Sequence, residues 1–333
     1  MINIHSPKVS ILLPVYNAEK YISACLESLL AQTFQDFEII AINDASSDSS
    51  LCILEAYANK DPRIKIYCNE SNLKISATLN KGLKIASAPL IARMDADDIA
   101  FSQRIERQYC FMTSYPEVTV SGTGIQVFGT DVIWNVPESN NEIRATLFFN
   151  SPILHPTAIY RKEFIINYGG YSENAPYAED YDLWHRLSTN KNIIFANINT
   201  PLLYYRITTS EKSHKYKIIQ NKTADLIRKR QIESLGISIT DQQIALHNNI
   251  SCYKDFTKYS QLIASYYWLR SITKSPRASK DLKDLCWYYW KKICLISSCK
   301  MISFPLYILL PSPQKIKNII NFIYKRVKKC III

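Results

Sequence analysis

The first hundred residues of the chain alternate short apolar runs with segments whose apolar residues recur at helical spacing. A short, continuous apolar run is typical of a strand that is buried on both faces. Because strands that alternate with helices are joined by right-handed β-α-β crossovers, the pattern predicts an α/β fold with a mostly parallel sheet. The predicted strands are residues 9–15, 37–42, 64–67 and 90–94, and the predicted helices are residues 22–30, 51–57 and 75–86.

Polar side chains follow three of these predicted strands. They are Tyr16 with Asn17, Asn43 with Asp44, and an acidic group that begins at Asp95. The carboxyl ends of parallel strands meet at one edge of a sheet, and ligands of such sheets bind outside that edge. The sequence therefore predicts a binding site that these polar groups share.

Asp95, Asp97 and Asp98 follow directly on the apolar run of the fourth predicted strand. Like charges so close together repel one another, and partial burial adds a desolvation cost. A hard divalent cation offsets both effects, and Mg²⁺ or Mn²⁺ held by carboxylates commonly bridges to substrate phosphates. From this motif alone, the alternative is a solvated acidic turn that caps the following helix.

The composition excludes several other classes of site. The chain has only 7 Gly. It lacks both the glycine-rich dinucleotide-binding motif and the phosphate-binding loop of nucleoside triphosphatases. Its 9 Cys and 5 His show no zinc-binding spacing, and we expect a reducing compartment and no secretion. Cys25, Cys52 and Cys110 lie on apolar helical faces and are predicted to pack in the core.

Charge divides the chain into two parts. Residues 1–215 carry a net charge of −4, whereas residues 216–333 carry +15. We therefore predict one domain over residues 1–215 and a basic helical extension over residues 216–333. Within the first part, further extended segments are predicted at residues 118–121, 125–128, 155–160, 195–198 and 202–207, and a helix is predicted to begin at Glu179.

Five segments form an ordered series: Val9-Ser-Ile-Leu-Leu-Pro-Val-Tyr-Asn17, Asn43-Asp-Ala-Ser-Ser-Asp48, Asn80-Lys-Gly82, Met94-Asp-Ala-Asp-Asp98 and Ala178-Glu-Asp-Tyr-Asp-Leu-Trp184. In order and spacing, the series resembles the motifs of family 2 glycosyltransferases with the GT-A fold. The resemblance extends from residue 8 to about residue 207. It implies a Rossmann-like, mostly parallel sheet with helices on both faces, followed here by a helical, basic extension.

The resemblance also implies a UDP-sugar donor. Pro14, Val15 and Tyr16 would line the nucleotide pocket, with Tyr16 near the base or the ribose. Glu19 lies one turn further along the chain and would also contact the nucleotide.

The loops near the donor depart from the family at three positions, Asn43, Ala45 and Lys74. Asp44 would accept a hydrogen bond from the uracil N3–H, and Lys74 and Asn80 would approach the donor diphosphate. Ala45 and Lys74 stand where many relatives have glycine, which leaves the loop geometry and the sugar preference open. Without the other motifs, Asp44 and its neighbours would equally fit a turn and helix cap.

The resemblance also implies that the acidic cluster holds a divalent metal, Mn²⁺ or Mg²⁺. Asp95 and Asp97 match the D-x-D motif of the family; Asp97 would bind the metal directly, and Asp95 would hold the ribose or metal-bound water. Asp98 would lie next to the metal ligands without binding the metal itself. Arg93 would either offset the negative charge of the cluster or form a structural salt bridge. The metal would stabilise the departing nucleoside diphosphate as a Lewis acid.

Asp180 matches the general base of the family. Apolar surface from Tyr177, Tyr181 and Trp184 would raise the pKa of its carboxyl toward useful basicity. One displacement assisted by one base would invert the anomeric configuration. Taken alone, Glu179 and Asp180 would fit simple charge complementarity at a helix N-terminus.

Two further side chains have open roles. His155 would reach a phosphate or the metal, or else be structural, and Trp184 would stack on an acceptor sugar or pack half-buried. The Gln-x-x-Arg-Trp motif of polymerising relatives is missing. This absence favours the addition of a single sugar over processive synthesis.

The basic end of the chain predicts contact with a membrane. Residues 293–310 are apolar apart from Lys300 and are interrupted by Pro305, which is marginal for a membrane span. Residues 316–327 carry an apolar stripe surrounded by lysine and arginine, which is typical of a helix on an anionic leaflet. The alternatives are a basic helix packed on the first domain and a true transmembrane segment.

Together, these features predict a metal-dependent, inverting glycosyltransferase that is cytoplasmic and peripheral on the inner face of the cell membrane. It would move one sugar from a UDP-sugar to an acceptor glycan, favoured to be lipid-linked, in bacterial surface-polysaccharide assembly by family analogy. A nucleotidyltransferase is the alternative enzyme, although residues 11–19 lack the glycine-rich, basic phosphate loop that it would use. An inert membrane-bound scaffold is the non-enzyme alternative, and no nucleic-acid partner is expected because the basic part lacks a reader motif.

Overall fold

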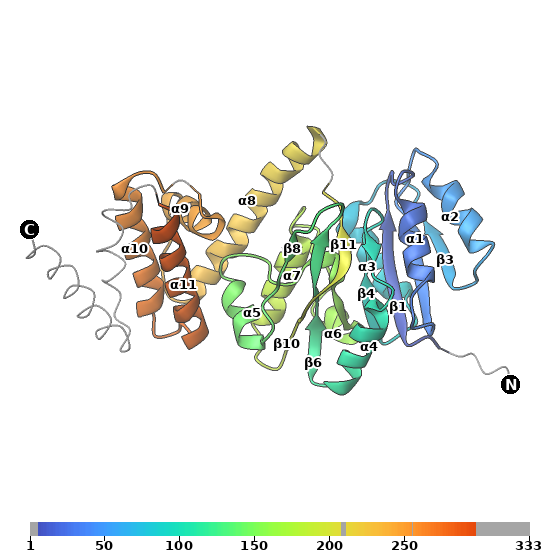
Figure 1. Ribbon diagram of the computed structural model, residues 1–333, viewed down its shortest axis with the longest axis horizontal. Helices are drawn as coiled ribbons and strands as arrows, with labels where there is room; N and C mark the ends of the chain where they lie inside the picture. Colours follow the sequence, from blue (N-terminus) through green and yellow to red (C-terminus); the bar gives the residue numbers. More distant parts are fainter. Residues whose placement is uncertain (1–5, 208–210, 255, 298–333) are drawn as a thin grey trace, which may run out of the picture. The chain divides into compact units, whose positions relative to one another are not determined.

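The computed structural model describes residues 6–207, 211–254 and 256–297 (Figure 1). The chain divides into two compact units, Met1–Arg228 and Lys229–Ile333. In the described part of the first unit, seven strands form one sheet in the order β10-β6-β9-β4-β1-β2-β3. Their bounds are β1 Val9–Val15, β2 Phe37–Asn43, β3 Ile64–Cys68, β4 Leu90–Arg93, β6 Val118–Ser121, β9 Ile159–Arg161 and β10 Ile194–Phe195.

The first four of these strands along the chain run parallel, as predicted. β1 lies between β2 and β4, and its last residue, Val15, pairs with Asn43 at the end of β2. Asn43 in turn pairs with Cys68 at the end of β3. The carboxyl ends of these strands therefore share one edge of the sheet, which confirms the predicted arrangement of the polar groups. β9 is antiparallel to both β4 and β6.

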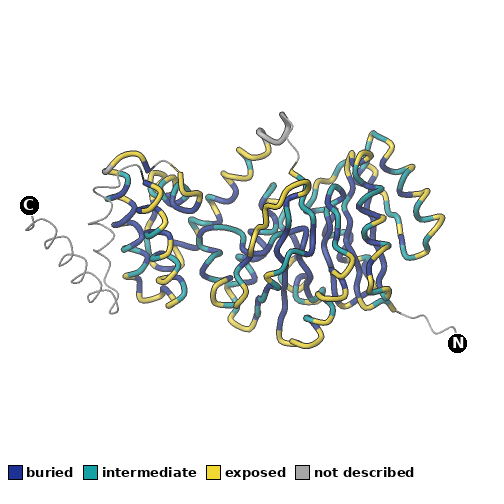
Figure 2. The backbone as a smooth tube through the Cα atoms, in the orientation of Figure 1, coloured by how far each residue is buried: buried dark blue, intermediate teal, exposed yellow. Residues whose placement is uncertain are grey.

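Helices cover both faces of the sheet because the strand side chains alternate between two cores. Ile11 and Leu13 of β1 pack in one core, whereas Leu12 packs in the other. Figure 2 shows the strands between these layers as mostly buried. The first core includes residues of α1 (Ile22–Leu30), α2 (Ser50–Ala58) and α4 (Arg104–Ser114); the second includes residues of α3 (Lys74–Ile85), α5 (Asn140–Thr146), α6 (Lys162–Asn167) and α7 (Glu179–Ser188).

A second, smaller sheet lies beyond the acidic cluster. Among the described residues its order is β5-β11-β7-β8, with β5 Ile99–Ala100, β7 Thr123–Val127, β8 Ile133–Trp134 and β11 Ile198–Tyr205. β11 is one eight-residue strand, so the two late strands predicted at residues 195–198 and 202–207 are partly wrong in their bounds. The extended segment predicted at residues 155–160 instead starts as a short 3-10 helix, His155–Thr157, before β9. Pro156 fixes its own φ and favours such a first turn.

The second unit is helical. It contains the end of α8 (Glu211–Ser234), then α9 (Asp241–Cys252), α10 (Tyr259–Lys274) and α11 (Lys280–Ile296). Inside it, the buried Trp268 donates its indole N–H to Nδ1 of the buried His247 at 3.0 Å. The domain boundary predicted between residues 215 and 216 falls inside α8, because the change in charge begins before the change in packing partners.

None of the helices among the described residues has both the length and the apolar character that crossing a bilayer requires. The predicted membrane-seeking stretch lies largely outside the described residues, since only its start, up to Ser297, is described. The predicted helical stripe at residues 316–327 lies entirely outside them.

The predictions for the cysteines are right in one case out of three. Cys25 is buried in the core, but Cys52 and Cys110 are exposed. Both exposed cysteines lie on helices whose core-facing side is formed by other apolar residues, Leu54 in α2 and Met112 in α4. Helical spacing shows that a face is apolar, but it does not decide which of two apolar faces turns inward.

Two consecutive glycines after α6 adopt positive φ, but only one of them is crowded. Gly169 has φ +81° and would have no neighbouring heavy atom within 4 Å of an added Cβ. Gly170 has φ +66°, and an added Cβ would overlap Oδ1 of Asn80. That amide is fixed, because Asn80 Oδ1 accepts from Tyr171 N–H and Asn80 Nδ2 donates to the Tyr171 carbonyl, both at 2.8 Å.

We therefore expect Gly170→Ala to lower the free energy of unfolding by about 3 kcal/mol, the sum of left-handed backbone strain and overpacking. Gly169→Ala is the matched control and should cost only about 1 kcal/mol, from backbone strain alone. Urea unfolding of both variants measures the difference. Equal losses would show that Asn80 does not hold this turn.

Candidate functional site

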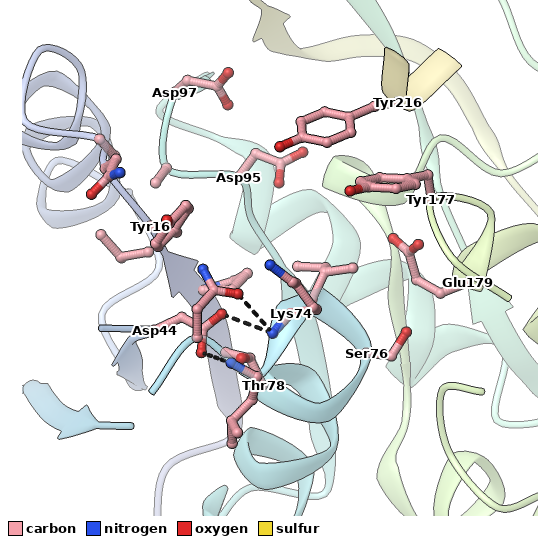
Figure 3. Close-up of a pocket in the computed structure, with 18 of the residues that line it drawn as sticks. Tyr16, Asp44, Lys74, Ser76, Thr78, Asp95, Asp97, Tyr177, Glu179 and Tyr216 are labelled. Atoms are coloured by element: carbon pink, nitrogen blue, oxygen red, sulfur yellow. Dashed lines mark hydrogen bonds between the residues drawn. The ribbon is translucent and has the colours of Figure 1, made fainter. Parts of the chain in front are cut away.

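A cavity of about 1580 Å³ opens at the carboxyl edge of the main sheet (Figure 3). Its walls come from the ends of β1, β2 and β4, from the start of α3, and from the segment that precedes α7. Of the residues predicted from the sequence to bind the donor or the metal, those that line it are Pro14, Val15, Tyr16, Glu19, Asp44, Lys74, Asp95 and Asp97.

Asn80 is the exception among the predicted donor-binding residues. It does not line this cavity, and its amide is occupied by both backbone groups of Tyr171. We therefore do not retain Asn80 as a donor contact. Its motif is explained by packing, since an added Cβ on Gly82 would meet Ile42 at 2.9 Å and Leu12 at 3.0 Å.

Asp44 holds the loop that opens α3. Its Oδ1 accepts hydrogen bonds from Asn69 Nδ2 at 2.7 Å and from Leu73 N–H at 2.8 Å, and its Oδ2 accepts from Lys74 N–H at 3.0 Å. Figure 3 draws the bond between Lys74 and Asp44 as a dashed line. A carboxylate offers about four lone-pair positions, so one remains for a ligand. Asp44 thus fixes the wall of the cavity and still faces into it.

Glu19 has a similar double role. Its Oε2 accepts from Ser49 N–H, and its own N–H donates to Asp48 Oδ2, both at 3.0 Å. These bonds hold the start of α2 beside the part of the cavity that Tyr16 and Asp44 line. Tyr16, by contrast, is 53% exposed and presents its ring to the opening.

Several non-glycine residues at the rim have positive φ. They are Asn17 at +51°, Ala45 at +56°, Lys74 at +71° and Tyr177 at +61°. The two positions where this chain departs from glycine, Ala45 and Lys74, are both among them. The turn geometry is therefore the one that glycine adopts without strain, kept here at a cost of roughly 1–2 kcal/mol per residue. Such strain typically concentrates at functional sites.

The acidic cluster brings three carboxylates together. One oxygen each from Asp95, Asp97 and Asp98 lies within 4.8 Å of the others. Burial and the charge of Asp95 raise the pKa of Asp97 to about 6 and that of Asp98 to about 8. Asp98 Oδ1 accepts from Arg206 N–H at 2.9 Å, while its buried Oδ2 has no hydrogen-bond donor among the described residues.

Arginines offset part of this charge. Arg93 forms an ion pair with Asp95, which is compatible with both of its predicted roles. Arg206 Nε donates to the carbonyl oxygen of Asp97 at 2.9 Å. Arg104 is fully buried behind β4, and burial lowers the pKa of its guanidinium to about 10. Even with these arginines, the pKa values of Asp97 and Asp98 are raised and the buried Asp98 Oδ2 has no hydrogen-bond donor among the described residues. A set of ligands that are all oxygen atoms fits Mg²⁺ or Mn²⁺.

Asp180 lies in an adjoining cavity of about 320 Å³. Ser151 Oγ donates to its Oδ2 at 3.0 Å. Burial raises the pKa of Asp180, and the charge of Glu179 adds to this effect. His155 faces the pair, with Nδ1 3.5 Å from Glu179 Oε1, and its Nε2 lies 3.2 Å from the Tyr171 hydroxyl.

The open roles of His155 and Trp184 are resolved differently. Trp184 is fully buried in the core behind α7, so its packing role holds and it presents no face to an acceptor sugar. His155 lines the cavity of Asp180 but not the cavity of the acidic cluster. It therefore lies nearer the candidate base than the candidate metal site.

Sequence reasoning missed several residues that line the main cavity. Arg206 follows β11, Glu179 was seen only as a helix-start charge, and Tyr216 and Gln220 come from α8. The ring of Tyr216 stacks on Tyr177 with centroids 4.6 Å apart, and Gln220 donates to the Tyr177 carbonyl at 2.8 Å. Nothing in the sequence near residue 216 signals this contact, because it depends on how α8 packs.

Comparison with known proteins gives consistent matches. A family described as Glycosyl transferase family 2 matches residues 10–169. An uncharacterized glycosyltransferase of Haemophilus influenzae is 34% identical over 254 residues, which cover 70% of this chain and 77% of that protein. The O-antigen biosynthesis glycosyltransferase WbnJ of Escherichia coli is 32% identical over 233 residues, which cover 67% of this chain and 91% of WbnJ.

Among solved structures, S. aureus TarS in complex with UDP-GlcNAc has a similar fold. The TM-score is 0.58 at 22% sequence identity, and the match covers 86% of this chain and 88% of that one. At this identity the likeness concerns the fold, and it agrees with the expected mostly parallel sheet and C-terminal helical extension.

The raised pKa values of Asp97 and Asp98 predict a pH-dependent stability. In the metal-free protein, the folded state keeps protons that the unfolded chain, with carboxyl pKa near ~3.9, has already released. The free energy of unfolding should therefore fall as the pH rises from about 4 to about 8, by up to about 1.4 kcal/mol per pH unit for one titrating carboxyl. Urea unfolding at a series of pH values measures this slope.

Asp98→Asn should flatten the upper part of the profile, whereas Asp131→Asn, in an exposed turn, should leave it unchanged. Millimolar Mn²⁺ should raise the stability of the wild-type protein most at pH 8, where the cluster is ionised. A flat wild-type profile between pH 5 and pH 8 would contradict the assignment.

Proposed function

The chain belongs to glycosyltransferase family 2, and from this premise we propose that it is a metal-dependent, inverting enzyme that moves one sugar from a UDP-sugar to an acceptor glycan. One observation carries the proposal. The cavity bordered by Tyr16 and Asp44 also contains Asp95 and Asp97, and it adjoins the cavity of Asp180. This arrangement supports a nucleotide, a diphosphate, a transferred sugar and a base bound in that order along the two cavities.

The nucleotide end is built from Tyr16 and Asp44. The exposed Tyr16 ring offers a stacking surface, and the remaining lone pair of Asp44 is suited to the N3–H of uracil. The TarS structure with UDP-GlcNAc supports a UDP-sugar as the donor. Lys74 lines the same cavity and supplies a positive charge for the diphosphate.

The diphosphate end is built from the acidic cluster. Asp97 and Asp95 would hold Mn²⁺ or Mg²⁺, with Asp98 behind them. When bound, the ion supplies charge neutralisation for the departing diphosphate. Arg206 lines the same cavity, and its guanidinium packs over Phe128 with a centroid distance of 4.2 Å, so its charge is fixed beside the cluster.

Asp180 is the proposed general base. The burial that raises its pKa makes it a better proton acceptor, and the bond from Ser151 fixes its orientation. Attack by a single acceptor hydroxyl, deprotonated by Asp180 from the side opposite the leaving diphosphate, inverts the anomeric carbon. The proton of that hydroxyl ends on the Asp180 carboxyl.

The proposed setting is the assembly of a cell-surface polysaccharide on the cytoplasmic face of the membrane. WbnJ, which acts in O-antigen biosynthesis, supports this class of product. The proposed acceptor is a lipid-linked glycan, and the basic, apolar segment after residue 297 is proposed to bring the enzyme to the anionic surface where such an acceptor lies. We do not propose nucleic acid as a partner.

Binding of UDP tests the metal site. Calorimetry should detect UDP uptake by the wild-type protein in Mn²⁺, and Asp97→Ala should weaken it more than about tenfold, because even residues that only support a metal ligand typically contribute 10–100-fold. The control is Asp131→Asn, whose side chain is exposed and outside both cavities. UDP binding that is independent of both the ion and Asp97 would refute the metal assignment.

Transfer kinetics test the base. Asp180→Asn should lower kcat by about 10²–10⁴-fold while leaving the Kd for UDP within about twofold, because only proton transfer is lost. The readout is UDP release with a polysaccharide-precursor acceptor, which also separates this activity from a nucleotidyltransferase, since the latter releases pyrophosphate. Unchanged transfer in both Asp97→Ala and Asp180→Asn would favour the inert scaffold.

A further inference from the structure

The second half of α11 has two unlike sides (Figure 1). On the inner side, which packs against α9 and α10, Cys286, Trp290 and Ile293 are buried. On the outer side, Tyr288 is 48% exposed and Leu295 is 67% exposed. An aliphatic side chain this exposed leaves most of its apolar surface in water, so a contact that covers it is favourable.

The outer side of α11 forms one continuous stripe. A single helical face, with residues at i, i+3, i+4 and i+7, contains Tyr288, Lys291, Lys292 and Leu295. Ile296, which is 50% exposed, continues the apolar surface at the end of the helix. We call these five residues the α11 stripe. It combines two cations with an apolar end.

Lysines of this half of α11 lie over aromatic rings. Lys292 Nζ is 5.6 Å from the ring centroid of Tyr288, and Lys291 Nζ is 5.5 Å from that of Trp287. A cation at such a distance is attracted to the face of the ring. Each lysine and each ring has an apolar body and a polar tip, and this combination is typical of residues at the boundary between water and a membrane.

A neighbouring loop extends this surface with the same kinds of residue. Ser297 Oγ donates to the carbonyl oxygen of Phe256 at 3.1 Å, which holds the end of α11 beside the loop that follows α9. Tyr253 of that loop is 36% exposed, and its ring centroid lies 5.5 Å from that of Tyr289. The exposed Lys254 follows it. The surface at this end of the helix is therefore rich in tyrosine and lysine.

Charge limits what can cover the α11 stripe. Residues 285–333 contain nine Lys or Arg and no Asp or Glu. Seven of these cations lie in residues 298–333, so the lysines of the stripe would repel that segment, and a second copy of the chain would present the same lysines. The complementary partner is therefore anionic. Leu295 and Ile296 favour a partner that also has an apolar interior, and an anionic lipid bilayer has both properties.

We propose that the α11 stripe docks on an anionic phospholipid bilayer. The ammonium groups of Lys291 and Lys292 lie among the lipid phosphates, while Leu295 and Ile296 enter the boundary between headgroups and acyl chains. This inference goes beyond the proposed function, because it assigns membrane contact to α11 itself rather than to the segment after residue 297. It rests on the proposed function only for the anionic membrane surface as the place where the enzyme works.

Co-sedimentation of the full chain with vesicles tests the electrostatic part. Vesicles of phosphatidylglycerol and phosphatidylcholine should bind more protein than vesicles of phosphatidylcholine alone. The double variant Lys291→Gln with Lys292→Gln should bind about 25-fold more weakly, since each lysine beside an anionic surface contributes about fivefold. Binding should also fall as NaCl rises from about 0.1 M to about 1 M, because the Debye length shrinks from about 10 Å to about 3 Å.

The matched control removes the same charge from the other end of the same helix. Lys280 and Lys283 are both exposed, and Lys283 lies roughly 12 Å before Lys291 along the helix axis, at about 1.5 Å per residue. This separation exceeds the Debye length of about 8 Å at physiological salt. Lys280→Gln with Lys283→Gln should therefore weaken vesicle binding less than about threefold.

Leu295→Ser tests the apolar part. It should weaken binding to the anionic vesicles about tenfold through the loss of one aliphatic side chain, and it should leave the unfolding midpoint unchanged because Leu295 is exposed. Leu226→Ser is the matched control, since Leu226 of α8 is 57% exposed, and it should leave vesicle binding unchanged. Leu295→Trp should add fluorescence that lipids with brominated acyl chains quench.

Three results would overturn the inference: vesicle binding that no α11 variant weakens, equal losses in the variants and their controls, or binding that single-stranded DNA displaces and that Leu295→Ser leaves unchanged. The first result would assign the binding to the segment after residue 297 and would leave the proposed function intact. Absence of any binding to anionic vesicles would refute this inference together with the proposed membrane setting. Loss of UDP binding or of sugar transfer would refute the proposed function alone, because vesicle binding does not use the cavity.

Discussion

The clustering of three carboxylates at the end of β4 is the electrostatic constraint on which the site depends. Asp98 is buried with an unmatched oxygen, and the pKa values of Asp97 and Asp98 are raised to about 6 and about 8. Arg93, Arg104 and Arg206 surround the cluster but bond mainly to the backbone or to Asp95. The arginines therefore offset part of the charge in the folded chain without neutralising the cluster, which supports the proposed divalent ion.

Several loops around the cavity contain residues with positive φ. Asp44 accepts hydrogen bonds from the backbone N–H groups of Leu73 and Lys74, and Lys74 adopts positive φ in this loop. Ala45 and Tyr177 are strained in the same sense at two other places on the rim. Lys74 and Tyr177 line the cavity, so two of the strained residues place a side chain where a glycine would leave only backbone at the cavity wall.

Much of this arrangement follows from local patterns. Apolar runs and helical periodicity predicted the four parallel strands and the edge where Tyr16, Asp44 and Asp95 meet, because crossover handedness leaves few alternatives. The motif series predicted the family and eight of the residues that line the main cavity. For Asn80, the motif shows that the residue is required but not for what, and the structure gives its amide a role in holding the Tyr171 backbone beside Gly170. The predictions for Cys52 and Cys110 failed because both helices carry more than one apolar face.

The sequence by itself determined the fold class, the acidic cluster and the candidate base, since each of these depends on residues that are close together in the chain. Only the tertiary structure decided which charged groups meet across the cavity. Arg93 and Glu179 are far apart in the sequence, and their meeting depends on how α7 packs against the end of β4. This packing is a property of the whole core that no local pattern contains.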